Sequence, residues 1–121
     1  MNIEQHIAAA GRIENSLRKC SAEDVEMQIE AAMLAGTHWL NAALHRMAAT
    51  EPASDVFHTY LLTVNAYRKL CVANEEMVRA LSEIEDLRPP FVRGNMPGAE
   101  AAADRARELL SVIRLKATAG G

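Results

Sequence analysis

The sequence predicts an all-α protein, an up-down bundle of the four-helix-bundle type with five helical segments in one domain, residues 1–121. Three observations favour this fold. Half of the residues are hydrophobic and only 4% are aromatic, so Ala, Leu, Ile, Val and Met must fill the core, a composition that favours helices over sheets. Apolar residues recur at intervals of three, four and seven, and no run alternates as a strand would. The few prolines and glycines lie between these runs.

The first two predicted helices lie in the N-terminal part of the chain. Asn2 and Gln5 have the spacing of a capping box, which places the first helix at about residues 2–19. Ser21 is a good N-cap for a second helix at about residues 22–48. This second helix is about twice the average helix length of a dozen residues, which suits a central position in a bundle.

Two shorter helices are predicted in the middle of the chain. After a loop, Ser54 or Asp55 can cap a third segment at about residues 55–72. Asn74 can cap a fourth segment, residues 74–87, whose apolar positions keep the helical period. The two segments therefore follow each other with almost no connection.

A proline pair and a change of charge mark the C-terminal part. Pro89 and Pro90 stop the fourth helix, because proline lacks an N–H and disfavours the α region at the residue before it. A final helix is predicted at about residues 98–117. Residues 88–121 hold 6 basic and 3 acidic side chains, net +3, whereas residues 1–87 hold 7 basic and 13 acidic, net −6.

The bulk composition excludes several classes of function. A net charge of −3 and a pI near 5.8 argue against a protein that binds nucleic acid as a bulk polyanion. Cys20 and Cys71 form no motif and predict free thiols in a reducing compartment. The sequence shows neither a signal peptide nor a membrane span. We therefore expect a cytoplasmic protein that does not contact membranes and needs no cofactor.

Three stretches resemble the HEPN family of small helical bundles: "EAAMLAGTHWLNAALHRMAAT", "DVFHTYLL" and "EIEDLRPPFVRGNMPGAEAAADRARELLSVIR". They are similar to that family's long second helix, its His-led turn, and its Arg-containing linker before a final amphipathic helix. Catalytic members carry an Arg followed four to six residues later by a His, and no histidine of this chain has an Arg at that spacing. The resemblance therefore implies a non-nucleolytic module that forms a homodimer and binds a nucleotide or a partner protein such as a nucleotidyltransferase.

The second predicted helix carries a polar constellation on one face. At 100° per residue, Thr37, His38, Asn41 and His45 fall within an arc of about 100°. Together with His58 from the next segment, they could line a pocket for a small ligand. The alternative is a set of hydrogen-bonded polar groups at a helix contact, since buried polar groups are nearly always bonded. Met27 and Leu34 lie on the same arc, so this face could also meet a further helix or a second subunit.

A metal site is not predicted on this face. His38 and His45 are two helical turns apart, about 10.5 Å along the axis, and cannot chelate one ion as an i, i+4 pair can. No pair of Glu-x-x-His motifs, as in a di-iron bundle, is present. No set of residues predicts catalysis either.

The linker "RPPFVRGNMPG" is a candidate anion site. Arg88 and Arg93 supply hydrogen-bond donors, and Gly94 and Asn95 allow unusual backbone angles just before a helix N-terminus. The alternative is a plain helix connection in which proline and glycine only turn the chain.

The sequence thus favours a non-catalytic binding module over an enzyme. The alternative function is a small enzyme, or a metal- or ligand-binding bundle, that uses His38, Asn41, His45 and His58 in an interhelical pocket. A purely structural homo-oligomer would need none of these side chains to touch a ligand.

Overall fold

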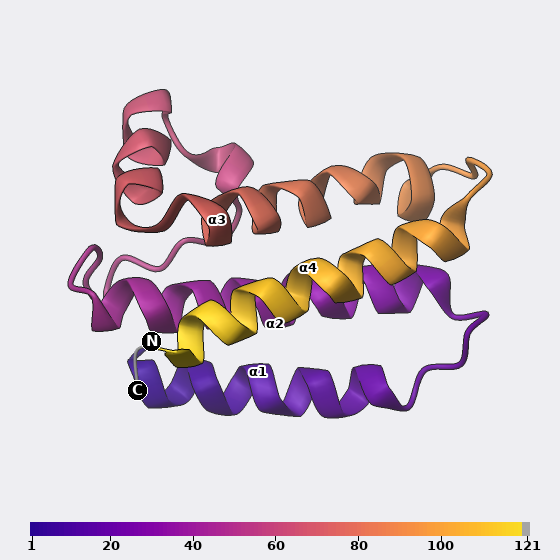
Figure 1. The fold of residues 1–121 in the computed structure, drawn as a ribbon, viewed down its shortest axis with the longest axis horizontal. Coiled ribbons are helices and arrows are strands. Elements are labelled where there is room, and N and C mark those ends of the chain that lie inside the picture. Colours follow the sequence, from indigo (N-terminus) through magenta and orange to yellow (C-terminus); the bar gives the residue numbers. More distant parts are fainter. Residues whose placement is uncertain (120–121) are drawn as a thin grey trace.

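The computed structural model describes residues 1–119 and contains only helices and loops over that range. Consecutive α-helices run in opposite directions (Figure 1). The all-α prediction is confirmed, but the third and fourth predicted segments are joined in one helix, so the structure has four α-helices. They are α1 (Ile3–Arg18), α2 (Val25–Arg46), α3 (Val64–Arg88) and α4 (Ala99–Ala119), with a 3-10 helix η1 (Thr59–Leu61) before α3 and a π-helical turn η2 (Pro89–Arg93) after it.

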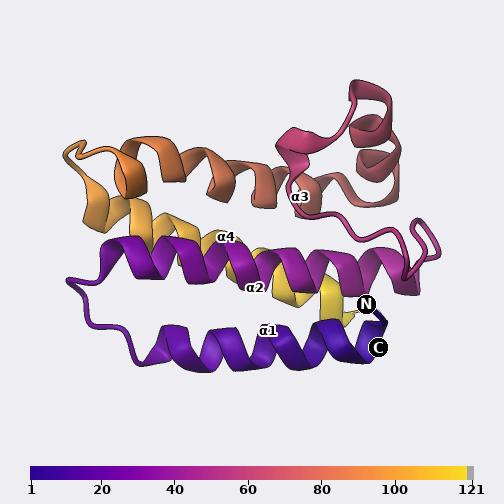
Figure 2. The ribbon, with the colours of Figure 1, turned by 180° about the vertical axis from the view of Figure 1, so that it is seen from behind.

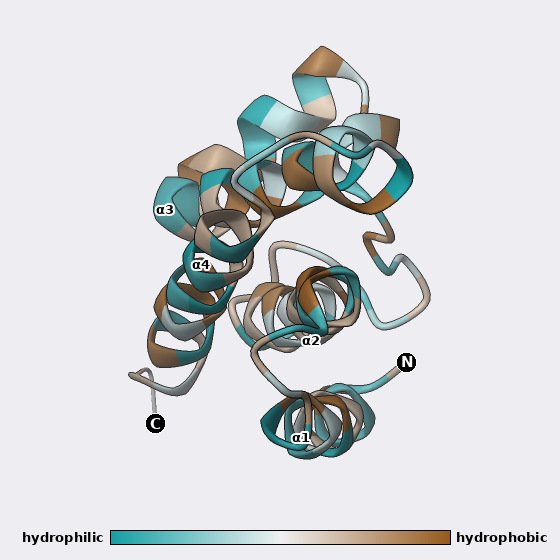
Figure 3. Ribbon diagram, turned by 90° about the vertical axis from the view of Figure 1, so that its right-hand side faces the viewer, coloured by the Kyte–Doolittle hydropathy of each residue, from teal (hydrophilic) through white to brown (hydrophobic). Residues whose placement is uncertain are grey.

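The helix α2 is the centre of the bundle and contacts α1, α3 and α4. Viewed along the bundle, α2 lies between α1 on one side and the pair of α3 and α4 on the other (Figure 3). Gly36 lets these helices approach closely, because a Cβ atom there would lie 3.1 Å from Ile113 Cδ1 of α4 and 3.5 Å from Leu81 Cδ1 of α3. The largest fully buried apolar side chains come from α2, α3 and α4: Ile29, Leu40, Leu44, Met77, Leu81, Ile84 and Ile113.

Local signals set the start of α1 but not the start of α2. The capping box is confirmed, since Asn2 Oδ1 accepts from Gln5 N–H at 2.8 Å and Gln5 Oε1 accepts from Asn2 N–H at 2.9 Å. Ser21 as the N-cap of α2 is wrong, because the helix starts at Val25. The Ser21 N–H instead donates to the Asp24 carboxylate at 2.8 Å, which forms a turn ahead of the helix.

The start predicted for the third helix, near residue 55, is too early. Neither Ser54 nor Asp55 is its N-cap, and the chain forms the η1 turn before α3 begins at Val64. Thr63 is the actual N-cap, and its hydroxyl oxygen accepts from Ala66 N–H at 3.1 Å. The physical reason is that the Asp55 carboxylate accepts from two histidine rings at 2.7 and 2.9 Å and is not available as a cap.

The helix α3 is kinked at Asn74, which has φ −163° and ψ 93°. Asn74 Oδ1 accepts from Met77 N–H at 3.1 Å, so the predicted cap of the fourth segment is confirmed inside a longer helix. The first half of α3 turns away from the bundle and packs with η1 at one end of the molecule (Figures 1 and 2). We call residues 57–73, which include η1 and this half helix, the arm.

The α-helical part of α3 ends at Arg88, but the proline pair does not stop the helical path as predicted. Arg88 and Pro89 keep right-handed helical angles, and the chain continues through η2 to Arg93 before α4. The predicted final helix matches α4 closely. None of the helices within residues 1–119 combines the length and the apolar character needed to cross a bilayer.

The Asn74 cap gives a direct test of the kink. Asn74→Ala removes the oxygen that accepts the Met77 N–H, and an N-cap of this type is worth about 1 kcal/mol. We expect the free energy of unfolding, measured by urea denaturation, to fall by about that amount. Asn74→Asp keeps the acceptor and serves as the matched control. An alanine variant as stable as the parent would show that the cap does not hold the kink.

Candidate functional site

Three histidines and one carboxylate from distant parts of the chain form a partly buried group, which we call the histidine–aspartate cluster: His6, His38, His45 and Asp55. His6 lies on α1, His38 and His45 on α2, and Asp55 in the loop after α2. His6 Nε2 and His45 Nε2 both contact Asp55 Oδ1, at 2.9 and 2.7 Å. His6 is 2% exposed and His45 8% exposed, so both rings are held inside the fold.

The other ring nitrogens of the two buried histidines are also hydrogen-bonded. His6 Nδ1 lies 2.9 Å from His38 Nδ1, and His45 Nδ1 lies 2.7 Å from Thr50 Oγ1. The His6 ring stands near both α2 rings, with centroid distances of 5.2 Å to His38 and 5.3 Å to His45. Bonds at both edges fix the orientation of each buried ring.

The electrostatics of the cluster favour an ionised carboxylate. Burial on its own raises the pKa of Asp55, but hydrogen bonds from His6, His45 and the Met1 amino group, together with the charge interaction with His6, lower it to about 2. The Met1 nitrogen is 3.1 Å from Asp55 Oδ2. Burial, followed by the neighbouring His6, lowers the pKa of His38, which favours its neutral form.

The cluster joins two residues that the sequence singles out with two that it does not. His38 and His45 were predicted as a candidate ligand face, whereas His6 was not considered and Asp55 was assigned to a helix cap. The 32-residue separation of His6 from His38 leaves no local pattern to find. Only the antiparallel packing of α1 on α2 brings these residues together.

The polar side-chain groups of Thr37 and Asn41 are hydrogen-bonded to backbone groups. Asn41 is 1% exposed; its Oδ1 accepts from Val56 N–H at 2.7 Å and its Nδ2 donates to Val56 O at 2.7 Å. Thr37 Oγ1 donates to Met33 O at 2.8 Å within its own helix. Asn41 therefore holds the segment beside Asp55 against α2, and thereby positions the carboxylate of the cluster.

His58 lies in a different place, so the structure does not assemble one pocket from His38, Asn41, His45 and His58. His58 Nδ1 is 3.1 Å from Glu85 Oε2, and its ring stacks on Tyr60 with a centroid distance of 4.6 Å. Glu85 is buried and accepts from the Thr59 N–H at 2.9 Å and from the Thr59 hydroxyl. These bonds tie the start of the arm to the second half of α3.

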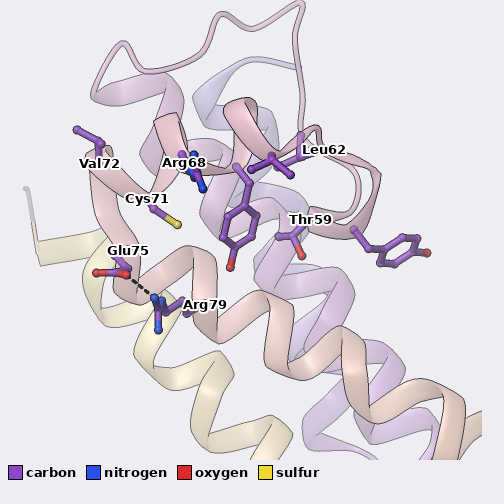
Figure 4. A pocket seen from close by; sticks show the side chains of 10 residues that line it. Thr59, Leu62, Arg68, Cys71, Val72, Glu75 and Arg79 are labelled. Carbon is purple, nitrogen blue, oxygen red and sulfur yellow. Dashed lines mark ion pairs between the residues drawn. The ribbon is translucent and has the colours of Figure 1, made fainter.

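A hollow of about 740 Å³ lies in the arm, where η1 and the first half of α3 meet the kink. Arg68, Cys71, Glu75 and Arg79 lie along α3 around it (Figure 4). Glu75 and Arg79 form an ion pair at 2.7 Å. No pattern in the sequence marks this hollow, because it forms only where the kink at Asn74 turns the two halves of α3 toward each other. Its lining residues are Thr59, Tyr60, Leu62, Val64, Tyr67, Arg68, Cys71, Val72, Glu75 and Arg79.

The linker predicted as an anion site is a tightly bonded turn. Arg88 Nε donates to Glu30 Oε1 at 2.6 Å, and Gly94 N–H donates to Pro89 O at 2.8 Å. A Cβ atom on Gly94 would lie 2.8 Å from Pro90 O, so glycine is required here by close packing. Arg93 and Asn95 are exposed on the same turn. Two of the four predicted residues thus have structural roles in the helix connection.

Comparison of the chain with models of known protein families, with curated proteins and with solved structures gives no match.

The role of Asn41 can be tested by stability. Asn41→Ala leaves the buried N–H and C=O of Val56 without partners, and each unsatisfied group costs about 1–3 kcal/mol. We expect the free energy of unfolding to fall by about 3 kcal/mol in chemical denaturation. Thr37→Val is the matched control, because the Thr37 hydroxyl bonds only to its own helix, and we expect a change below about 1 kcal/mol. Equal effects of the two substitutions would contradict the anchoring role.

Proposed function

We propose that this chain is a non-catalytic binding module that holds a small organic anion with an aromatic or apolar body in the hollow of the arm. The observation that carries the proposal is the hollow itself, about 740 Å³ and lined mainly by apolar and aromatic side chains, with two arginines and one glutamate that is paired with Arg79. Binding sites for small molecules have volumes of about 300–1,000 Å³ and this mixture of an apolar lining with a few polar groups.

Exposed apolar side chains support the same location. Several large apolar residues on the arm are well exposed, whereas the apolar residues that face the bundle are buried. A concentration of exposed apolar surface marks a site of interaction in soluble proteins. The residues are Phe57 (69% exposed), Tyr60 (61%), Leu61 (67%), Val64 (67%) and Val72 (89%).

The charge of the arm favours an anion. Residues 57–73 contain Arg68 and Lys69 and no acidic residue, although the whole chain has a net charge of −3. Arg68 lines the hollow and is exposed, while Arg79 is already paired with Glu75. A guanidinium group binds carboxylate and phosphate oxygens through two parallel hydrogen bonds. Arg68 is therefore the side chain expected to hold the anionic group.

The aromatic lining favours a flat body next to that anionic group. Tyr60 and Tyr67 both line the hollow, and the Tyr67 hydroxyl is 3.3 Å from Ser82 Oγ, which orients its ring. Aromatic rings stack on planar groups with ring centroids about 4.5–7 Å apart. A mononucleotide combines a planar base with a phosphate, so the nucleotide that the HEPN resemblance implies fits the arm better than the bonded linker.

The remaining parts of the HEPN resemblance stay predictions. A homodimer through α2 would use the outward side chains of Met27 and Leu34, which are 63% and 47% exposed. A nucleotidyltransferase-like partner would also need to bind through exposed apolar side chains such as these. The enzyme alternative has less support, because His58 lies with Glu85 while His38 and His45 lie with His6.

Calorimetric titration of the full chain with a panel of mononucleotides tests the proposal. We expect saturable binding by the parent and at least about tenfold weaker binding by Arg68→Ala, since a charge-assisted bond is worth about 1.5–3 kcal/mol. Arg93→Ala is the matched control, because it removes an exposed arginine from the linker and leaves the arm unchanged. Its affinity should equal that of the parent.

Two other results would overturn this assignment. Loss of affinity in Arg93→Ala but not in Arg68→Ala would place the anion at the linker. Absence of heat with every nucleotide, together with a light-scattering mass near twice 13.2 kDa that falls to the monomer value in Val72→Asp, would make a second copy of the chain the occupant of the arm.

A further inference from the structure

We infer that His6, His45 and Asp55 form a binding site for one divalent transition-metal ion, with Zn²⁺ as the ion to test. This site is separate from the hollow of the arm and does not depend on the proposed function. Each residue offers one ligand atom, and the three atoms all lie within 4.8 Å of one another. The atoms come from α1, α2 and the following loop, so one ion would join three segments.

Two of the three distances between ligand atoms need only a small adjustment to hold the ion, and the two Nε2 atoms lie within 4.8 Å of each other. His6 Nε2 and His45 Nε2 lie 2.9 and 2.7 Å from Asp55 Oδ1. Tetrahedral ligands at about 2.0–2.2 Å from Zn²⁺ are about 3.3 Å apart, so each contact must widen by roughly half an ångström. Both Nε2 atoms already approach the same carboxylate oxygen, and the ion would take a place between these three atoms.

The outer partners of both rings suit metal ligation. A ligating histidine binds the ion through one nitrogen and donates the N–H of the other to a nearby acceptor, which fixes its tautomer and direction. His38 Nδ1 can accept from His6 Nδ1, and Thr50 Oγ1 can accept from His45 Nδ1, at 2.9 and 2.7 Å. Without an ion, both Nε2–H groups donate to Asp55. With an ion, each ring would ligate it through Nε2 and donate from Nδ1, so binding breaks no outer hydrogen bond.

The carboxylate side of the cluster borders a surface hollow. Thr50 and Asp55 line a surface hollow of about 300 Å³ between the loop after α2 and the first half of α3. Lys69 also lines this hollow and is exposed, so it leaves the approach partly cationic but is not bonded to the cluster.

The ligand set selects the class of ion. Two imidazoles and one carboxylate suit Zn²⁺, Fe²⁺, Co²⁺ or Ni²⁺, whereas Ca²⁺ and Mg²⁺ require mainly oxygen ligands. Three protein ligands leave one position for water or another small ligand. The sequence speaks against a metal through the wide spacing of His38 and His45 and the lack of paired Glu-x-x-His motifs, and neither reason includes His6. In the proposed site His6 takes the place of His38 as the second ligand, and His38 becomes its positioning residue.

Zinc titration of the chelator-treated full chain by calorimetry, with a parallel thermal melt, tests the site. We expect one equivalent of Zn²⁺ to bind and the melting temperature to rise, because an ion that binds only the folded state stabilises it. Asp55→Asn and His45→Gln should each weaken binding by at least about 100-fold, since even the loss of an outer partner costs 10- to 100-fold. His58→Gln is the matched control and should bind like the parent, because His58 lies with Glu85.

A second readout keeps the test decisive if a variant fails to fold by circular dichroism. In the parent, ¹⁵N spectra of the histidine rings should show Zn²⁺ shifting the Nε2 resonances of His6 and His45. No stoichiometric binding by the parent would overturn the site. Undiminished binding in both folded variants, or ring shifts confined to His58, would also overturn it, because the ion would then lie elsewhere.

Discussion

The Asp55 carboxylate and its donors hold three separate parts of the chain together. A charged side chain held inside a fold must be paired and hydrogen-bonded, because an unpaired one is too costly to remove from water. Here the donors come from α1, α2 and the Met1 amino group. The start of α1, the end of α2 and the loop between α2 and η1 are therefore fixed relative to one another by one carboxylate.

The path of the following chain depends on this anchor. With Asp55 held by histidines and Val56 held by Asn41, this stretch is not free to begin a helix. The helix α3 starts eight residues after Val56, at Val64, and the kink at Asn74 then returns the chain to the bundle. Glu85 completes the arrangement by binding Thr59 from the other side. The arm and its hollow are thus consequences of where the loop is tied.

The bundle around α2 and the arm differ in how much apolar surface they bury. The contacts of α2 with the other helices bury the largest apolar side chains, and Gly36 sets how closely they approach. The arm keeps few such contacts and exposes apolar and cationic side chains around a hollow. A surface of that kind on a firm support is typical of binding modules, because the core supplies the stability that the exposed part lacks.

The sequence by itself determined the all-helical class, the capping box at Asn2 and the cap at Asn74. These features depend on interactions between residues three or four apart, so their patterns are visible in a single chain. Only the tertiary structure decided that His38 and His45 lie with His6 and Asp55, that His58 lies with Glu85, and that the arm encloses a hollow. Hydrogen bonds across 27 to 49 residues leave no periodic signal, because they exist only after the helices have packed.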